Sequence, residues 1–357
     1  MKTLRRYLIK EVLASTLLVL SALLMLWSGF ELIGELGDMS ANRSTWRSIV
    51  ITFSSVPANA YMLLPIAALL GSLFALAQLN QNSEYTVMRA SGASVWQIIR
   101  PLATLGLVLA VVAFLLAEFA VPAAENVRQT ARAAASSSKN AVQRFKSGFW
   151  FREGNTFINT AGVLSDSKLS QVRVMEFDND GRLLVMLRAD SAAFLGGSEW
   201  ELTNVQRTRF GDKKIENETA AQMRWQSVLT PNMLSVLQLQ PDKLSASSLW
   251  EYTQHLRKNN QKSNLFEAAL WNKALYPLAC CVLIILALPF AQVSRRSGGV
   301  GMRIFIGILV GLVFILCNRL FTYLGQIYNW PPSISALLPF LMFIVLTVVM
   351  IVRVERR

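Results

Sequence analysis

The sequence predicts an α-helical membrane protein with six transmembrane helices and an inserted all-β domain of the jelly-roll or sandwich type. Long apolar runs fill residues 12–121 and 266–352, whereas residues 136–262 carry alternating, charged sequence with turn signals. Of the 357 residues, 53% are hydrophobic and 16% are charged, which is typical of a membrane protein. We expect membrane helices in residues 1–135, the β domain and a return helix in residues 136–262, and membrane helices again in residues 263–357.

Six apolar segments are long enough to be membrane spans, because about 20 apolar residues cross a bilayer core of about 30 Å. The expected spans cover approximately residues 12–33, 59–79, 98–121, 266–293, 300–328 and 335–352. The first segment also has features of a secretory signal peptide. It is longer than a typical signal-peptide core and lacks a clear small-x-small cleavage site, so we interpret it as a retained anchor.

Basic residues in the short loops indicate the orientation of the spans. When six spans are drawn, the basic clusters near both termini, between spans two and three, and between spans four and five all fall on one side. The positive-inside rule makes that side cytoplasmic and places the insert outside, in the periplasm of a double-membrane bacterium. The net charge of +13 therefore reflects topology rather than nucleic-acid binding.

The sequence indicates no catalytic, cofactor or metal site, and we expect a chain that is not itself an enzyme. Cys280, Cys281 and Cys317 lie inside expected spans, where a small apolar side chain packs well. His255 is the only histidine, and no second histidine or cysteine lies near it in the sequence. The glycine cluster at residues 298–301 lacks the lysine of a phosphate-binding loop.

Alternating residues and turn signals predict several short strands in the insert. The expected strands cover approximately residues 149–152, 156–159, 171–177, 182–188, 200–210 and 214–225. The turn Asn179-Asp180-Gly181 separates two of them, and its glycine permits the positive φ that a tight hairpin requires. Strands at this spacing favour a sandwich or jelly roll. An open sheet leaves an edge strand that a partner's strand can extend.

A short amphipathic helix is expected between the strands and the fourth span. Leu249, Tyr252 and Leu256 recur at helical spacing, and Ser247 or Ser248 is available as the N-cap. We interpret this segment as a packing helix under the β domain.

The loop between spans two and three contains a second short helix, within residues 83–92. It has a cap-like serine at its start, Glu84 in its first turn and a glycine at its end. A helix this short is marginal alone in water, so we expect it to dock into another protein through Tyr85 and Met88, with Glu84 as a fixed charge. The alternative is an ordinary interfacial helix on the lipid surface.

Six short segments, in order along the chain, carry a family resemblance. They are Ser83-Glu-x-x-Val-Met-x-Ala-Ser-Gly92, Glu118-Phe-Ala-Val-Pro122, Gly148-Phe-Trp150, Pro241-Asp-x-Leu-Ser245, Trp271-Asn-Lys-x-x-x-Pro277 and Tyr328-Asn-Trp-Pro-Pro332. With the topology, they resemble the lipopolysaccharide-export permeases, the YjgP/YjgQ (LptF/LptG) family. The segments at Pro241 and Trp271 are more similar to the LptG branch, and the LptF branch is the alternative.

The resemblance implies a permease subunit of an ATP-driven exporter in the bacterial inner membrane. Such a subunit extracts lipopolysaccharide from the outer leaflet and pairs with an LptF-like permease. An LptB-like cytoplasmic ATPase supplies the energy, and LptC-like and LptA-like periplasmic β proteins receive the lipid. The loop helix then contacts the ATPase, and its coupling residues are Glu84, Tyr85, Met88 and Arg89.

The resemblance also implies basic side chains near the outer leaflet, because lipid A carries phosphates and arginine binds phosphate bidentately. Snorkelling to the membrane interface is the alternative role for Lys273 and Arg319. Glu118, near the outer end of span three, needs a cationic partner in lipid, and the expected partner is an arginine at position 128, 132 or 319. The expected substrate-binding residues are Arg128, Arg132, Arg319, Lys273, Arg43 and Arg47.

One stretch departs from the family pattern. Some members carry lysines at the outer end of span one that resemble phosphate contacts, whereas this chain has Glu31, Glu35 and Asp38 there. Acids at these positions repel lipid A phosphates unless they are paired or bridged by a divalent cation. The first bases beyond them, Arg43 and Arg47, are weak replacements.

Two other functions stay open at the level of sequence. A permease-like subunit of another ATP-driven exporter of lipids or lipoproteins would keep the coupling helix without needing arginines at the outer face. A membrane sensor with an outer β domain would need no ATPase contact. Lipid bound after detergent extraction and copurification of an ATPase distinguish these alternatives.

Overall fold

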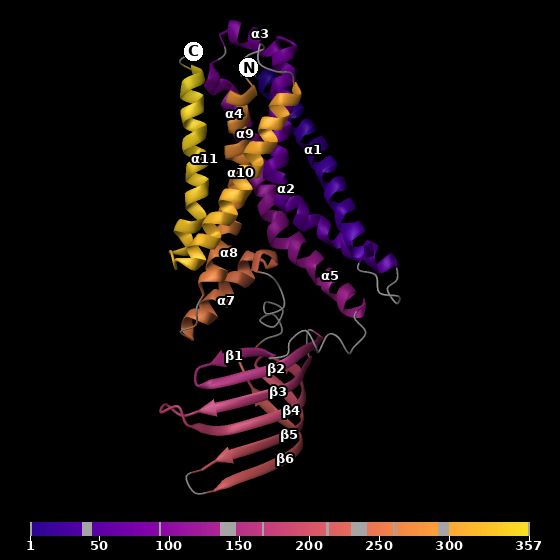
Figure 1. Ribbon diagram of the computed structural model, residues 1–357, viewed down its shortest axis with the longest axis vertical. Coiled ribbons are helices and arrows are strands. Elements are labelled where there is room, and N and C mark those ends of the chain that lie inside the picture. Colours follow the sequence, from indigo (N-terminus) through magenta and orange to yellow (C-terminus); the bar gives the residue numbers. More distant parts are fainter. Residues whose placement is uncertain are drawn as a thin grey trace. The chain divides into compact units, whose positions relative to one another are not determined.

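The computed structural model describes residues 2–37, 45–92, 94–135, 148–165, 168–211, 214–229, 241–259, 261, 263–291 and 300–355. The chain divides into two compact units. One unit, Met1–Gln129, Ser245–Leu249 and Asn264–Arg357, contains the long helices in Figure 1. The other, Thr130–Leu244 and Trp250–Ser263, contains the sheet.

Six helices among the described residues are long and apolar enough to cross a membrane, which confirms the predicted number of spans. The loop helix α3 (Glu84–Ala90) lies between the second and third spans in the chain. The spans are α1 (Lys2–Gly37); α2 (Thr45–Gln81); α4 (Val95–Leu115) with the π-helical turn η1 (Leu116–Ala120) and α5 (Val121–Ala135); α8 (Asn264–Leu275) with the 3-10 turn η4 (Tyr276–Leu278) and α9 (Ala279–Ala291); α10 (Val300–Ile327); and α11 (Pro332–Glu355).

Several helices extend beyond the predicted apolar segments. Helix α1 begins at Lys2 rather than near residue 12. Helix α2 begins at Thr45 rather than near residue 59 and continues through Pro57. Membrane helices tolerate proline because neighbouring groups satisfy the freed backbone carbonyl. The third span continues through η1 into α5, and the backbone positions of residues 128 and 132 therefore lie one helical turn apart.

Small residues bring helices of the membrane unit into close contact. A Cβ atom at Gly71 of α2 would lie 2.4 Å from the Cα atom of Thr16 on α1, and a Cβ atom at Gly106 of α4 would lie 2.7 Å from the Cα atom of Cys281 on α9. Backbone approach of this kind is typical of membrane bundles, where dispersion contacts rather than the hydrophobic effect hold helices together. Buried aliphatic side chains of α2, α4 and α9 surround these contacts.

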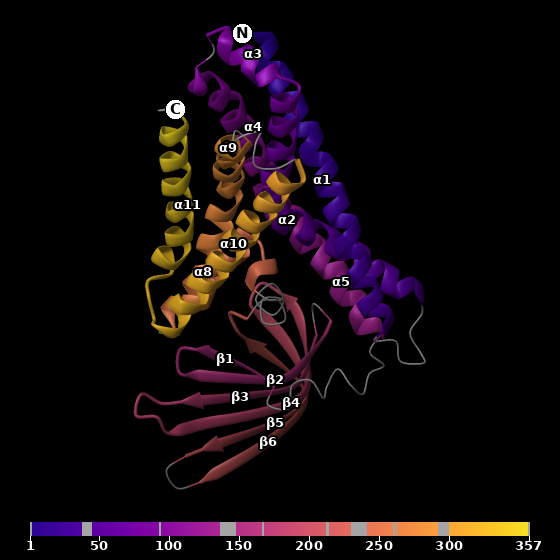
Figure 2. The same cartoon turned by 45° about the horizontal axis from the view of Figure 1, so that its top comes forward.

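The sheet unit contains six antiparallel strands that lie in chain order. Each strand pairs with the next, and Figure 2 shows the strands bending along their length. The inserted all-β domain is confirmed, but the described strands form one meander rather than the facing sheets of a sandwich. Short hairpin turns place consecutive strands side by side. The strands are β1 (Phe149–Glu153), β2 (Thr156–Ser165), β3 (Lys168–Phe177), β4 (Leu183–Gly196), β5 (Glu199–Phe210) and β6 (Ile215–Gln226).

Alternate side chains of the sheet form its hydrophobic core. Ile158, Leu169, Trp200 and Leu202 are fully buried in this core. The indole N–H of Trp200 donates a hydrogen bond of 2.9 Å to the carbonyl of Leu229. The buried polar atom of the largest core side chain is therefore satisfied, as a stable core requires.

Helix α7 (Ala246–Lys258) is the predicted return helix, and Leu249, Tyr252 and Leu256 are buried as expected. Its N-cap differs from the prediction. The hydroxyl of Ser245 accepts a hydrogen bond of 3.1 Å from the backbone N–H of Ser248. The helix begins before Ser247, so Ser247 and Ser248 lie inside its first turn and cannot serve as its N-cap.

Candidate functional site

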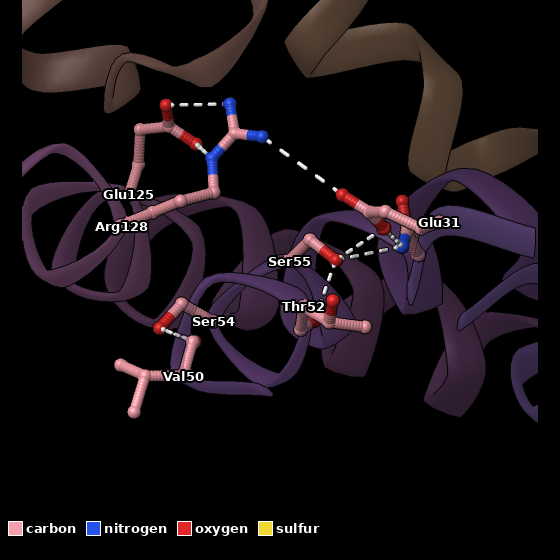
Figure 3. Close-up of polar contacts among 8 residues, drawn as sticks. Glu31, Val50, Thr52, Ser54, Ser55, Glu125 and Arg128 are labelled. Atoms are coloured by element: carbon pink, nitrogen blue, oxygen red, sulfur yellow. Dashed lines mark hydrogen bonds and ion pairs between the residues drawn. The ribbon is translucent and has the colours of Figure 1, made fainter. Parts of the chain in front are cut away.

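Arg128 lies in a cluster of polar side chains contributed by α1, α2 and α5 (Figure 3). Its Nε atom donates to Oε2 of Glu125 at 2.9 Å, and its Nη2 atom donates to Oε1 of Glu125 at 2.8 Å. Its Nη1 atom lies 3.9 Å from Oε1 of Glu31. The Arg128 side chain is 11% exposed, so these two carboxylates supply much of its polar surroundings.

Glu31 joins α1 to α2 as well as to Arg128. The hydroxyl of Ser55 and the side-chain amide of Asn59 both donate to Oε2 of Glu31, at 2.5 and 3.0 Å. Ser55 and Asn59 are one helical turn apart on α2, so their side chains share a face. One carboxylate oxygen of Glu31 therefore accepts hydrogen bonds from α2, and the other faces the guanidinium of Arg128 (Figure 3).

Two carboxylates share one guanidinium in this cluster. In a low-dielectric environment, ionised groups persist when they are paired and hydrogen-bonded, as Glu31 and Glu125 are. The guanidinium fork that binds a carboxylate also matches a phosphate group. Arg128 thus has a guanidinium that can bind an anion, and acidic side chains already contact it.

Glu118 lies in the π-helical turn η1 and contacts the first turn of α7. Its carboxylate accepts hydrogen bonds from the backbone N–H of Ala246 at 2.7 Å, the backbone N–H of Ser247 at 3.3 Å and the hydroxyl of Ser247 at 2.8 Å. The positive charge of Lys273 is near enough to act on it. We expected an arginine partner. The described contacts are instead the N–H groups and a hydroxyl at a helix N-terminus, which stabilise a carboxylate, and the charge of Lys273 acts in the same direction.

Lys273 and Arg319 lie in different surroundings. Lys273 on α8 is 4% exposed, which argues against the snorkelling alternative for this side chain. Arg319 on α10 is exposed. Figure 1 shows α5 and the C-terminal end of α10 well apart within the helical unit. The expected substrate-binding residues therefore fall into at least two groups.

The remaining expected substrate-binding residues are described in part. The backbone of Arg132 belongs to α5, and its side chain lies outside the described residues. Arg43 also lies outside them. Arg47 is exposed in the first turn of α2.

The loop helix α3 is connected to α1 through Glu84. The hydroxyl of Tyr7 donates to Oε2 of Glu84 at 2.9 Å, and the side-chain amide of Asn82 lies 3.4 Å from its other oxygen. Ser83 has a left-handed φ of 63° and makes no side-chain cap, unlike the expected cap-like serine. Gly92 ends the segment with a φ of 86°, as the sequence predicted.

The side chains of α3 are accessible to different degrees. Tyr85 is partly buried and packs against the hydrophobic core of the helix bundle. Burial raises the pKa of its hydroxyl. Met88 is partly exposed, and Arg89 is exposed. Val87 is 65% exposed. Of the two predicted apolar anchors, Tyr85 thus faces its own bundle more than solvent, while Val87 is the most exposed large apolar side chain of the helix.

Sequence reasoning missed several residues of this site. Glu125 stands three positions before Arg128, a spacing at which opposite charges meet on one helix. That signal was present in the sequence. Tyr7, Ser55 and Asn59 gave none, because their contacts with acidic residues depend on how separate helices pack.

The chain is similar along nearly its whole length to proteins named lipopolysaccharide export system permease protein LptG. It is 30% identical over 351 residues to that of Haemophilus influenzae, which covers 96% of each chain. It is 29% identical over 353 residues to that of Escherichia coli strain K12, which covers 98% of this chain and 97% of the relative. The LptF protein of the same E. coli strain is 34% identical over 115 residues, 30% of each chain.

A sequence model of the family described as lipopolysaccharide export system permease LptF/LptG matches residues 6–353. This match spans the six membrane-length helices and the sheet. The coverage of the relatives confirms the greater similarity to LptG that the segments at Pro241 and Trp271 indicated. The chain therefore belongs to the family of lipopolysaccharide export system permeases LptF/LptG.

Proposed function

We propose that this chain is the transmembrane permease subunit of an ATP-driven exporter that extracts lipopolysaccharide from the outer leaflet of the inner membrane and passes it toward a periplasmic bridge. The observation that carries this proposal is the similarity to LptG permeases over 96% and 98% of the chain. Six membrane-length helices and a separate sheet agree with such a subunit. ATP hydrolysis takes place in another subunit.

The proposal assigns a side of the membrane to each part. Both termini and α3 lie in the cytoplasm, and the β domain lies in the periplasm, because the basic residues gather in one set of loops. Residues 1–135 and 263–357 form the membrane helices, and residues 136–262 form the periplasmic domain with its return helix.

The cytoplasmic contact is made by α3 with an LptB-like ATPase. Its coupling residues are Glu84, Tyr85, Met88 and Arg89. Helix α3 has no fully buried residue, and Met88 and Arg89 are accessible to a partner. Val87 adds an exposed apolar contact. Because Tyr85 packs against the hydrophobic core of the helix bundle, a force on α3 reaches the bundle directly.

Lipid A phosphates bind the basic residues of the outer half. Arg128 is the best supported of them, because it already coordinates anionic oxygens bidentately. The other members of this proposed group are Arg132, Arg319, Lys273, Arg43 and Arg47.

The remaining partners are an LptF-like permease in the membrane and LptC-like and LptA-like β proteins in the periplasm. Within the described sheet, β6 pairs with β5 alone and is an edge strand. An edge strand offers unpaired backbone groups that a partner's strand can continue. The β domain is thus suited to pass lipid along an extended β structure.

Reconstitution tests this function. The chain is assembled with its LptF-like partner and LptB-like ATPase in lipid nanodiscs that contain lipopolysaccharide, and release to a soluble LptA-like acceptor is measured. We expect release that requires ATP and every subunit. Export of another lipid or a lipoprotein, with lipopolysaccharide left in the disc, would instead support a permease of a different exporter.

A further inference from the structure

The guanidinium of Arg128 is occupied by carboxylates, although the proposed function assigns a lipid phosphate to it. Glu125 holds two of its nitrogen atoms at 2.8 and 2.9 Å, and Glu31 lies 3.9 Å from the third. An arginine side chain has a fixed number of planar N–H donors. Glu125 accepts from two of the five N–H donors, so a phosphate has the Nη1 side of Arg128 left to bind, and Glu31 faces that side (Figure 3).

We propose that Glu31 is an internal competitor for the anion that Arg128 binds. A lipid phosphate displaces Glu31 from the guanidinium, and Glu125 stays in place and positions the side chain. This inference rests on the proposed function, to which it adds a residue that sets affinity for the phosphorylated lipid.

The two carboxylates differ in the way that this exchange requires. Glu125 precedes Arg128 by three residues on α5 and makes two hydrogen bonds to it. Glu31 belongs to α1, and its distance of 3.9 Å is beyond hydrogen-bond range, so it acts by charge alone. Glu31 is the weaker ligand and the one that an incoming anion replaces.

The displaced carboxylate keeps its own hydrogen bonds. Ser55 and Asn59 donate to Oε2 of Glu31, whereas Arg128 faces Oε1. A buried carboxylate left without partners is strongly destabilising. Because its two donors come from α2 and not from Arg128, Glu31 can lose the guanidinium without becoming unsatisfied.

The two carboxylates beside Arg128 have a consequence for transport. With phosphate on Arg128, Glu31 and Glu125 remain nearby and repel it. This repulsion limits affinity and favours release, which a subunit that must hand its lipid onward requires.

The test compares two lipids on the assembled complex in nanodiscs. Glu31→Gln keeps an acceptor oxygen for Ser55 and Asn59 and removes the charge that faces Arg128. We expect this variant to bind lipopolysaccharide about three- to tenfold more tightly, the factor for an ion pair of about 1 kcal/mol. Affinity for enzymatically dephosphorylated lipopolysaccharide should not change. A purely structural role of Glu31 would alter both affinities alike.

Two further variants separate the possible failures. Ser55→Ala removes one donor from Glu31 but leaves its charge, so the ratio of the two affinities should stay at the wild-type value. Arg128→Gln should lower the preference for the phosphorylated lipid and abolish the effect of Glu31→Gln in the double variant. If Arg128→Gln leaves that preference unchanged, the substrate role of Arg128 in the proposed function is wrong. If it lowers the preference while Glu31→Gln does not raise it, the competitor role of Glu31 is overturned and the proposed function stands.

Discussion

The carboxylate of Glu118 accepts a hydrogen bond of 2.7 Å from the backbone N–H of Ala246, which lies 128 residues further along the chain. The first N–H groups of a helix have no partner within the helix. Glu118 accepts hydrogen bonds from two of these N–H groups, those of Ala246 and Ser247. The hydroxyl of Ser245 accepts one from the N–H of Ser248. The N-terminus of α7 is therefore capped both locally and from the π-helical turn of span three.

The first prediction concerns this distant cap. Glu118→Gln removes the charge and one acceptor oxygen, so the first turn of α7 should open more often. Loss of a cap costs about 1 kcal/mol, or roughly fivefold faster amide hydrogen exchange. Exchange mass spectrometry of residues 245–249 measures this effect. Ser247→Ala is the control, because it removes the hydroxyl donor and leaves both backbone donors, and its effect should be smaller. Equal exchange in wild type and Glu118→Gln would contradict the capping role.

The second prediction concerns the loop helix α3. Glu84→Ala should uncouple ATP hydrolysis from lipopolysaccharide release without unfolding the chain, if Glu84 contacts a basic group of the ATPase. Tyr7→Phe removes the hydroxyl that donates to Glu84 and leaves the carboxylate free for the partner. An exposed hydrogen bond contributes about 1 kcal/mol or less, so Tyr7→Phe should keep most of the coupling. Parallel ATPase and release assays decide the point, and loss of coupling in both variants would show that the Tyr7 contact itself is required.

The third prediction concerns pH and the β domain. The ring of His255 stacks on Phe151 with centroids 4.7 Å apart. Burial lowers the pKa of His255 below its ordinary value of 6.5, although the charge of Glu153 opposes this shift. The unfolded chain therefore binds the proton more readily than the folded unit. The contribution of neutral His255 to stability is present above pH 6.5 and is lost as the pH falls through the lowered pKa.

Hydrogen exchange of strand β1 as a function of pH tests this dependence. Protection should fall with the pH in the wild-type chain. His255→Gln should be less protected near neutral pH and show a flatter profile, because it cannot titrate. The same slope in both proteins would assign the pH dependence to other groups.

The fourth prediction concerns the close crossing of α1 and α2. Gly71→Ala places a methyl group 2.4 Å from the Cα atom of Thr16, so the helices must separate. Overpacking of this kind costs about 1–3 kcal/mol. Gly34→Ala on α1 is the matched control, because a Cβ atom there meets nothing within 4 Å. Thermal unfolding in detergent should show a lower midpoint for Gly71→Ala alone, and equal midpoints would mean that the crossing adapts.

Local patterns in the sequence predicted most elements correctly. Apolar length gives the six spans, and turn residues give the hairpins: Gly154 and Gly181 have φ values of 59° and 79°. Helix ends were less accurate, because apolar length reports only the part within the hydrocarbon core. Helices such as α1 continue into polar sequence.

Contacts between distant segments were not predictable in the same way. The sequence indicated that Glu118 needs a positive partner, yet the donors at Ala246 and Ser247 are backbone groups, which any residue except proline carries. The arrangement of strands was also beyond local pattern. Hairpin signals are the same in a meander and in a sandwich, and the difference lies in how the sheet packs.

Helix α1 is a single helix from Lys2 to Gly37, and a polar side chain near each of its ends is held by another element. Tyr7 donates to Glu84 of the loop helix, and Glu31 faces Arg128. These residues are 24 positions apart, about 36 Å at about 1.5 Å per residue, which is more than the bilayer core of about 30 Å. A small tilt or axial turn of this one rod moves both ends together. A displacement of the loop helix α3 thus has a direct mechanical route to the carboxylate beside Arg128, with no relay of side chains between them.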